Sequence, residues 1–190
     1  MVRKLLLVAL VSVGLPACEK CGPFKKEYFD IVGMQALLLQ QPAGAVGQVL
    51  TTGQSVSTAE LQLLIRLDTK LYSAQPASAG GFAAMACEPA DPSYTESIDS
   101  LIVTSRYDYD TQHPAGTSLN DVVQLQNEYG QPISLREWLA VPKPVGGIPY
   151  PVFRLRQAPV SSATQQFRVR YHQTNGEVYT SETVAIEIRP

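Results

Sequence analysis

The chain has 190 residues, of which 15 are lysine or arginine and 17 are aspartate or glutamate, for a formal net charge of −2. Nucleic-acid binding calls for a basic patch, so this balance argues against a nucleic-acid partner. The length suits a single domain with its own hydrophobic core.

Residues 1–17 show the three-part pattern of a secretory signal peptide. Two cations come first, an uncharged apolar run follows at residues 5–15, and small residues then lead to Cys18. The run is shorter than the roughly 20 apolar residues that a membrane-spanning helix needs. The alternative is an N-terminal helix buried in the core, and it is disfavoured because Gly14 and Pro16 end the run where a cleavage site would lie.

Leu15-Pro16-Ala17-Cys18 resembles the lipobox of bacterial lipoproteins, with an aliphatic residue three positions before the cysteine and a small residue directly before it. Pro16 departs from the usual pattern. The resemblance implies that the peptide is cut before Cys18 and that its thiol and new amino group are acylated. Residues 1–17 are then the signal peptide and 18–27 the anchor and tether. Two or three acyl chains give stable attachment, so the protein is expected in the cell envelope, on the periplasmic side or at the cell surface.

The chain has three cysteines, Cys18, Cys21 and Cys87. If lipid takes Cys18, the other two remain as an even pair in an oxidising compartment, which predicts a disulfide between them. Such a bond stabilises by roughly 4 kcal/mol in the loop-entropy model. Two alternatives stay open. Cys18 and Cys21 form the spacing of a redox Cys-x-x-Cys motif, although that motif usually starts a helix after a strand. Two unpaired thiols are the other alternative.

Residues 28–190 alternate apolar and polar positions between turn residues, which predicts a single antiparallel β-sandwich domain. Strands are expected at residues 28–40, 61–72, 97–107, 151–157, 167–172 and 177–188. The last of these carries Val184, Ile186 and Ile188 on one face. Asn175-Gly176 predicts the hairpin turn before it, because this pair tolerates positive φ angles.

Helices are expected only as one or two short segments. Ser134 and Glu137 have the spacing of a capping box that starts a helix through Leu139. Residues 120–128 are the second candidate. Residues 73–92, which include Cys87, and residues 142–151 are rich in proline and are predicted to be loops.

Several segments resemble small lipoproteins of Bacteroidota-type bacteria whose role is unknown. The points of likeness are the cysteine shortly after the anchor, Met85-Ala86-Cys87-Glu88-Pro89, the strand from Ile98 to Thr104, and the hairpin ending Gly176-Glu177-Val178-Tyr179-Thr180. This resemblance implies an immunoglobulin-like sandwich and assigns no activity.

Candidate catalytic residues are few. The chain has two histidines, His113 in a turn-forming segment and His172 on the expected solvent face of a strand. It has no Gly-x-Ser-x-Gly motif, so neither histidine has an evident nucleophile. We therefore expect no enzymatic activity and no cofactor.

Acidic residues offer the alternative. In this alternative, we expect the oxygens of four residues to line one loop end: Asp108, Asp110, Asn120 and Asp121. Calcium binds six to eight oxygens. Their spacing is not that of an EF-hand, and aspartates after a strand commonly form turns. An envelope enzyme or a calcium-dependent binder using Asp108–Asp121 is thus the second hypothesis for function.

Two further patterns have a structural and a functional interpretation. Tyrosines 107, 109, 129 and 150 flank loops, where we favour packing over a platform for sugars or peptides. Arginines 154, 156, 168 and 170 form a basic stripe if their strands pair; glutamates 177, 182 and 187 or an acidic partner would match it. The sequence as a whole predicts a lipid-anchored, non-enzymatic binding or structural module with an envelope protein or glycan as partner.

Overall fold

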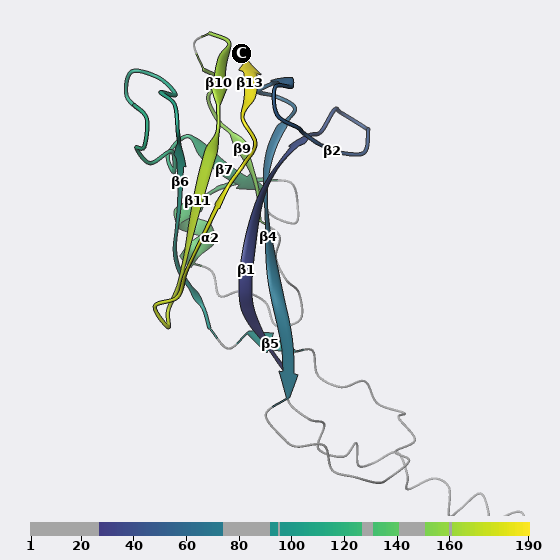
Figure 1. Ribbon diagram of the computed structural model, residues 1–190, viewed down its shortest axis with the longest axis vertical. Helices are drawn as coiled ribbons and strands as arrows, with labels where there is room; N and C mark the ends of the chain where they lie inside the picture. The colour runs from purple at the N-terminus through teal and green to yellow at the C-terminus, as the bar shows by residue number, and fades with distance from the viewer. Residues whose placement is uncertain (1–26, 74–91, 95, 127–130, 141–150, 160) are drawn as a thin grey trace, which may run out of the picture.

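The computed structural model describes residues 27–73, 92–94, 96–126, 131–140, 151–159 and 161–190, and these are mostly β-strands (Figure 1). The strands are β1 (Glu27–Gln40), β2 (Gln48–Val49), β3 (Ser55–Ser57), β4 (Leu61–Ser73), β5 (Ser93–Tyr94), β6 (Ile98–Ser105), β7 (Val123–Gln126), β8 (Pro132–Ser134), β9 (Val152–Leu155), β10 (Ala163–Gln165), β11 (Phe167–Gln173), β12 (Val178–Glu182) and β13 (Ile186–Arg189). A short helix, α2 (Leu135–Ala140), follows β8. The predicted all-β class is confirmed.

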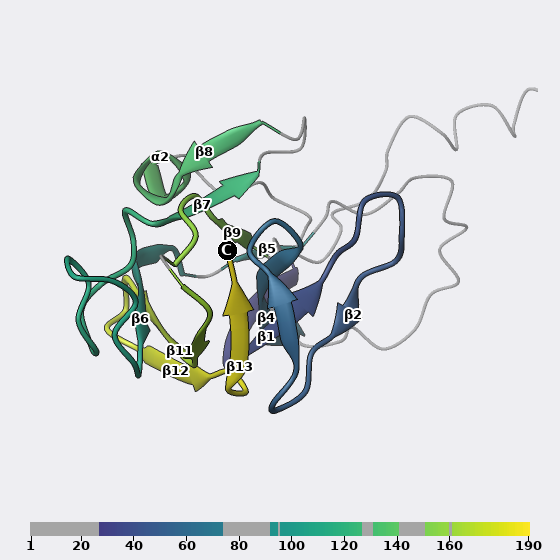
Figure 2. The ribbon, with the colours of Figure 1, turned by 90° about the horizontal axis from the view of Figure 1, so that it is seen from above.

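The strands form three sheets around a common interior (Figure 2). The large sheet has the order β2-β1-β4-β9-β7-β8, with β5 joined to β1, and the two small sheets are β10-β13-β3 and β12-β11-β6. The pairings are antiparallel except for β5 on β1 and β3 on β13. Buried apolar residues of all three sheets form one hydrophobic cluster, so the fold is sandwich-like as predicted. The finer expectation of an immunoglobulin-like topology stays a prediction.

The core side chains follow the predicted alternation. In β4, Leu61, Leu63, Ile65 and Leu67 are buried, and in β11 the same holds for Phe167, Val169 and Tyr171. The intervening residues of β11 are exposed or partly exposed. Successive side chains of a strand point to opposite faces, so each strand presents one apolar face to the interior.

A β-bulge at Val32 keeps β1 facing the core along its length. The pairing with β4 skips Val32, which is 53% exposed. Ile31 and Ala36 are five positions apart and would face opposite sides of a regular strand, but the extra residue brings both inside. Gly33 follows the bulge, where a Cβ atom would lie only 3.1 Å from Oδ2 of Asp68.

The hairpin turn at Asn175-Gly176 is confirmed. Gly176 has a φ of 90°, and its N–H donates to the carbonyl of Gln173 at 3.0 Å. The turn joins β11 to β12, whose register pairs Tyr171 with Tyr179.

The prediction of one continuous strand over residues 177–188 is wrong, because the chain changes sheet at Thr183. The segment divides into β12, which pairs with β11, and β13, which pairs with β10 and β3. Thr183 is buried and exchanges hydrogen bonds with Phe167 through both its backbone and its hydroxyl group. These bonds end the β12 ladder, and β13 continues on the other sheet. Ile186 and Ile188 are buried there, as predicted.

The prediction of a helix over residues 120–128 is also wrong. A turn at Asn120–Asp121 leads into β7, which pairs with both β8 and β9. Val123 and Leu125 are 2% exposed, so burial in a central strand outweighs the helical pattern of this stretch.

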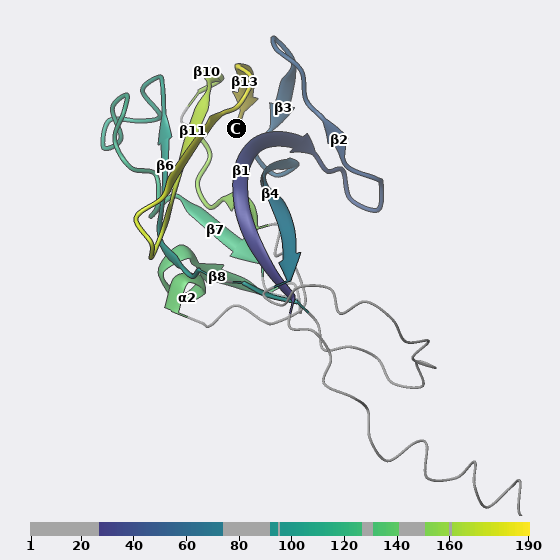
Figure 3. The same cartoon turned by 60° about the horizontal axis from the view of Figure 1, so that its bottom comes forward.

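The capping box at α2 is confirmed. Oγ of Ser134 accepts the N–H of Glu137 at 3.2 Å, while the Glu137 carboxylate accepts the N–H of Ser134 at 2.8 Å. These hydrogen bonds from Ser134 lower the pKa of Glu137. The helix that they start lies beside β8 and next to β7 (Figure 3).

Strand β12 lies against β1 across a seam between two different sheets. The Tyr179 hydroxyl donates to the carbonyl of Ile31 at 2.6 Å, and the N–H of Ala36 donates to Oγ of Ser181 at 2.9 Å. Burial raises the pKa of Tyr179 to about 12, with Glu177 adding to the effect, so the phenol stays a donor at neutral pH. Side chains thus provide the hydrogen bonds that close this side of the sandwich.

Candidate functional site

The N-terminal sites predicted from the sequence lie outside the described residues. Lipidation at Cys18 and the disulfide between Cys21 and Cys87 therefore stay predictions, as does the signal peptide 1–17. The described chain starts at Glu27, the first residue of β1, which pairs with Ser73 at the end of β4. In the described ranges, no helix has the length and apolar character to cross a membrane.

The predicted acidic site falls in the connection between β6 and β7, residues 106–122, called here the β6–β7 loop. It is the teal loop at the upper left of Figure 1, at the end of the sandwich opposite Glu27. The loop carries Asp108, Asp110, His113 and Asp121. Hydrogen bonds set its geometry in three places: at its base beside β6, in its first segment at Asp108 and Tyr109, and at its tip around His113.

At the base, a buried polar network joins the loop to β10. Oγ of Ser105 donates to Oε1 of Gln165 and accepts the N–H of Tyr107 at 3.1 Å. Nε2 of Gln165 donates to the carbonyl of Asp108 at 2.9 Å. Ser105 and Gln165 are 3% and 0% exposed, so these bonds are made away from water, where an unpaired group is costly.

This network was not predicted from the sequence. Its signal was present, because Gln165 shares the odd-numbered positions of Phe167, Val169 and Tyr171, which face the core. A glutamine at the start of an inward-facing series predicts a buried amide that needs partners on a neighbouring segment.

In the first segment of the loop, Asp108 hydrogen-bonds across the loop, and Tyr109 hydrogen-bonds to the chain at Gln157. Oδ1 of Asp108 accepts the N–H of Ala115 at 2.7 Å, across the width of the loop. Tyr109 is buried and its hydroxyl donates to the carbonyl of Gln157. Burial raises the pKa of Tyr109, and the nearby Asp110 carboxylate adds to the rise. Both side chains thus restrain the conformation of the loop.

At the tip, His113 lies between two carboxylates. Its Nδ1 is 2.8 Å from Oδ1 of Asp110, and its Nε2 is 3.1 Å from Oδ2 of Asp121. Oδ1 of Asp110 also accepts the N–H groups of Gln112 and His113, each at 2.8 Å. His113 thus links the first half of the loop, at Asp110, to its second half, at Asp121.

The carboxylates favour the protonated imidazole. A neutral ring has one N–H, whereas the cation donates from both nitrogens. The hydrogen bond to Asp110 and then that to Asp121 raise the pKa of His113. Burial acts to raise the pKa of Asp110, but its hydrogen bonds from the His113 ring and from the Gln112 and His113 amides outweigh burial and lower it.

This cluster predicts a pH window for the stability of the β6–β7 loop. Because the pKa of His113 is raised above 6.5, its contribution is complete below pH 6.5 and is lost as the pH rises through the folded-state pKa. The pKa of Asp110 is lowered below 3.8, so its contribution is present above pH 3.8 and is lost as the pH falls through its own folded value. The loop is therefore expected to be most protected from hydrogen exchange between these limits.

The measurement is an NMR titration of the His113 ring, assigned with a His172→Gln variant. We expect a midpoint above 6.5 in the wild-type protein and a lower midpoint in Asp121→Asn, which loses one carboxylate. A His113 midpoint at or below 6.5, or no response to Asp121→Asn, would contradict the described cluster.

Asn120, the fourth residue of the predicted calcium site, has a structural role. Its Oδ1 accepts the N–H of Val103 at 3.0 Å, and its Nδ2 donates to the carbonyl of Leu101 at 2.9 Å. The side-chain amide thus hydrogen-bonds to the edge of β6 much as a neighbouring strand would.

The structure does not gather the four residues around a common ion position. His113 occupies the space between Asp110 and Asp121, and Asp108 and Asn120 bind backbone groups elsewhere in the loop. Among the described residues, no group of three or more histidines, cysteines and acids is arranged to hold a metal ion. The calcium hypothesis therefore has no support from this geometry.

Catalysis through His113 has no geometric support either. A general base needs a ring nitrogen free to take a proton from a nucleophile. Both nitrogens of His113 are within hydrogen-bond distance of carboxylates.

The tyrosines separate into different environments. Tyr109 is buried, as the packing interpretation predicts, whereas Tyr107 is 41% exposed. Tyr129 and Tyr150 lie outside the described residues. The two described rings therefore do not form a shared platform.

The predicted basic stripe is not formed, because the strands that carry the four arginines do not pair. Strand β9 lies between β4 and β7, whereas β11 lies between β6 and β12. Arg168 instead forms an exposed ion pair with Glu182 on β12, one of the glutamates expected to match it. His172 is half-buried, so its expected position on the solvent face is only partly correct.

The described surface has two hollows beside the β6–β7 loop. One, of about 410 Å³, is lined by Asp108, Tyr109, Asp110, Thr111, Pro159, Ser161 and Ala163. The other, of about 250 Å³, is lined by loop residues such as Arg106 together with Arg168 and Glu182. Both are open to solvent at the loop end of the sandwich and form the candidate site together with the loop.

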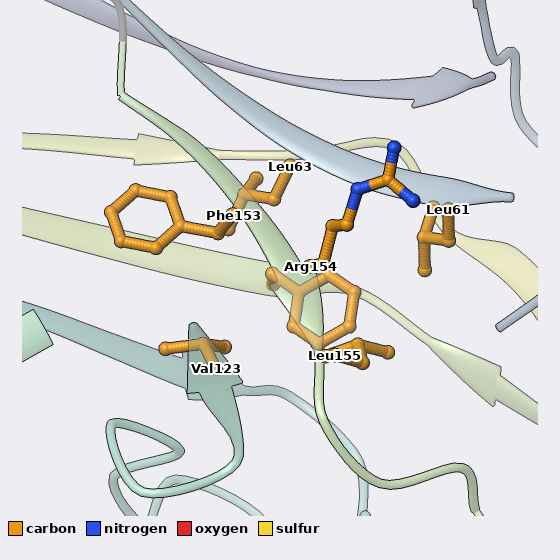
Figure 4. A pocket seen from close by; sticks show the side chains of 7 residues that line it. Leu61, Leu63, Val123, Phe153, Arg154 and Leu155 are labelled. Atoms are coloured by element: carbon orange, nitrogen blue, oxygen red, sulfur yellow. The ribbon is translucent and has the colours of Figure 1, made fainter. Parts of the chain in front are cut away.

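A third space lies inside the fold, next to Arg154 (Figure 4). Leu61, Leu63, Val123 and Phe153 line it, and its volume of about 10 Å³ is at most that of one water molecule. The guanidinium group of Arg154 lies on the side of Leu61 and points away from Phe153 and Val123. The space is a packing gap and holds no ligand-sized site.

Comparison with known proteins identifies no relative. No protein-family model matches the chain, and neither a curated protein nor a solved structure matches it.

Proposed function

We propose that the protein is a lipid-anchored component of the cell envelope whose β-sandwich is a non-enzymatic binding or structural module. The observation that supports this most directly is the position of the two ends of the sandwich. Glu27 begins β1 at one end, and the β6–β7 loop lies at the other (Figure 1). An anchor at Cys18 would hold the module by the Glu27 end and leave the loop facing away from the membrane.

The β6–β7 loop has the features of a recognition surface. Hydrogen bonds that Ser105 and Asp108 accept and that Tyr109 donates fix its backbone, so little conformational entropy remains to be lost on binding. Tyr107 is 41% exposed and Asp121 has a side chain that is 73% exposed, which gives the loop an aromatic face and an acidic edge. Such a surface suits an envelope protein or a glycan.

The non-enzymatic part of the proposal rests on the same loop. Its histidine and its carboxylates form hydrogen bonds within the loop. These hydrogen bonds make the loop rigid, as a binding surface requires. An isolated protein that turned over an envelope polymer in a saturable manner, and lost that activity in His113→Gln, would contradict this part.

The anchor is tested with a pair of cysteine variants. In Cys18→Ser we expect the protein to leave the membrane fraction completely, because the acceptor of the diacylglyceryl group is gone. Cys21→Ser, three positions away, is expected to stay in the membrane fraction. The measurement is the distribution of protein between the washed membrane pellet and the soluble fraction.

The result that contradicts the anchor is a wild-type protein found in the soluble fraction, or a Cys18→Ser protein that stays in the pellet. Loss of both variants from the membrane fraction would also contradict it, because Cys21 has no part in the proposed lipid attachment.

A further inference from the structure

Strands β1 and β4 pair as a long two-stranded ribbon, called here the β1–β4 ribbon. Its end at Glu27 and Ser73 extends beyond the hydrophobic core. In β4 the buried positions end at Leu67, and residues 70–73 are all exposed. Their partners at the start of β1 are Glu27 to Asp30, and β5 adds only a two-residue pairing there. This end of the ribbon is the lowest described part of the molecule in Figure 1.

The extension carries aromatic and aliphatic side chains. Tyr28 and Tyr72 are register partners whose rings stack with centroids 5.7 Å apart and planes at 29°. Phe29 and Leu71, the next pair, point to the opposite face. Leu71 is 50% exposed and Tyr72 is 41% exposed. We call these four residues the ribbon tip.

Among the described residues, the charges around the ribbon tip are the carboxylates of Glu27 and Asp30 and the ammonium group of Lys70. Asp30 and Lys70 are register partners, and Glu27 is the exposed first residue of the strand. The described residues here carry no surplus of cations, so they are unsuited to attraction by anionic lipid alone. Tyrosine has an apolar ring and a polar hydroxyl group and is enriched at the boundary between lipid tails and headgroups.

The sequence also limits how far the tip can lie from the bilayer. Glu27 follows Cys18 by nine positions, which even in an extended chain span at most about 30 Å. A lipid on Cys18 therefore keeps the ribbon tip at a high effective concentration next to the membrane surface.

We propose that the ribbon tip rests in the headgroup region of the bilayer that holds the anchor, with Tyr28, Tyr72 and Leu71 as the contacting side chains. This inference rests on the proposed lipid anchor and adds a second, non-covalent contact to it. The contact fixes the direction in which the ribbon leaves the membrane, so that the β6–β7 loop points outward.

The test uses the full mature lipoprotein in phospholipid vesicles, with acyl chains brominated close to the headgroup. One variant is Tyr72→Trp, at the ribbon tip. Its matched control is Tyr107→Trp, which replaces a tyrosine of equal exposure, 41%, at the opposite end of the molecule. Trp138 is present in every protein, and its signal is measured in the wild type and subtracted.

We expect the indole introduced by Tyr72→Trp to lose much of its fluorescence in brominated vesicles and to shift its emission to shorter wavelength. The indole of Tyr107→Trp is expected to do neither. Flotation of the same samples in a density gradient reports separately on the anchor.

The outcomes distinguish the two proposals. If both variants float with the vesicles and neither is quenched, or both are quenched equally, the docking of the ribbon tip is overturned and the anchor stands. If neither variant floats, the anchor fails and the docking fails with it. Quenching confined to Tyr72→Trp supports the docking, and it excludes a tip that is covered by residues 74–91.

Discussion

Phe167→Ala is expected to lower the free energy of unfolding by about 3–5 kcal/mol, the largest change among the single substitutions considered. Phe167 is 2% exposed on β11, and its ring lines the internal gap with Leu61 and Phe153 of the large sheet. Its side chain thus packs between two layers of the sandwich, the β12-β11-β6 sheet and the large sheet. Since small proteins are stable by only about 5–15 kcal/mol, much of the total would be lost.

The control for Phe167→Ala is the next residue along the strand. Arg168→Ala removes an exposed ion pair with Glu182, which is expected to change stability by at most about 1 kcal/mol. Chemical denaturation of both variants gives the comparison. Equal losses, or a loss below about 1 kcal/mol for Phe167→Ala, would contradict the packing of the two layers.

Gln165→Leu is expected to destabilise the protein and to release the base of the β6–β7 loop. The substitution removes the Gln165 acceptor of Ser105 Oγ, which keeps only the carbonyl of Gln166 at 3.5 Å, and it leaves the carbonyl of Asp108 without its donor. Each buried group left unpaired costs about 1–3 kcal/mol. We expect faster amide exchange in residues 106–116, measured by mass spectrometry, together with a lower midpoint of unfolding.

Two further variants separate this network from a general loss of packing. Thr164→Val changes the exposed neighbour on the opposite face and is expected to stay within about 0.5 kcal/mol of wild type. Adding Ser105→Ala to Gln165→Leu removes the hydroxyl group that has lost its Gln165 acceptor, so the double variant is expected to be less destabilised than the sum of the singles. Additive losses would show that Ser105 and Gln165 do not act together.

The strands that alternate strictly were predictable from the sequence. Leu61 to Leu67 and Phe167 to Tyr171 each place their apolar residues at every second position, and a period of two leaves one choice of inward face. The Asn175-Gly176 turn and the Ser134–Glu137 capping box were predictable for a similar reason, because each is specified by residues close together in the chain.

The features that the sequence did not reveal depend on contacts between distant segments. The chain changes sheet at Thr183 because that residue bonds to Phe167, and nothing local marks the break. Residues 123–126 became a strand because β8 and β9 lie on both sides. The arginines of β9 and β11 looked like one stripe until the pairing of those strands was known.

In the candidate site, too, the features set by nearby residues were predictable and those set by distant contacts were not. The sequence indicated that Asp108, Asp110 and Asp121 share a loop, but it did not indicate that His113 lies between two of them. It also gave Asn120 the wrong role, since its amide binds β6, which lies 17 and 19 positions earlier in the chain. Loop side chains are placed by their hydrogen-bond partners, and partners this far apart are not readable from spacing.

The most direct test of the proposed anchor is the intact mass of the protein extracted from membranes, before and after reduction and alkylation. The account predicts the mass of residues 18–190 plus a diacylglyceryl group and an acyl chain, with no thiol free before reduction. A lipid-free mass would contradict it: Cys18 would then have another use, and the redox interpretation of Cys18 and Cys21 would take its place.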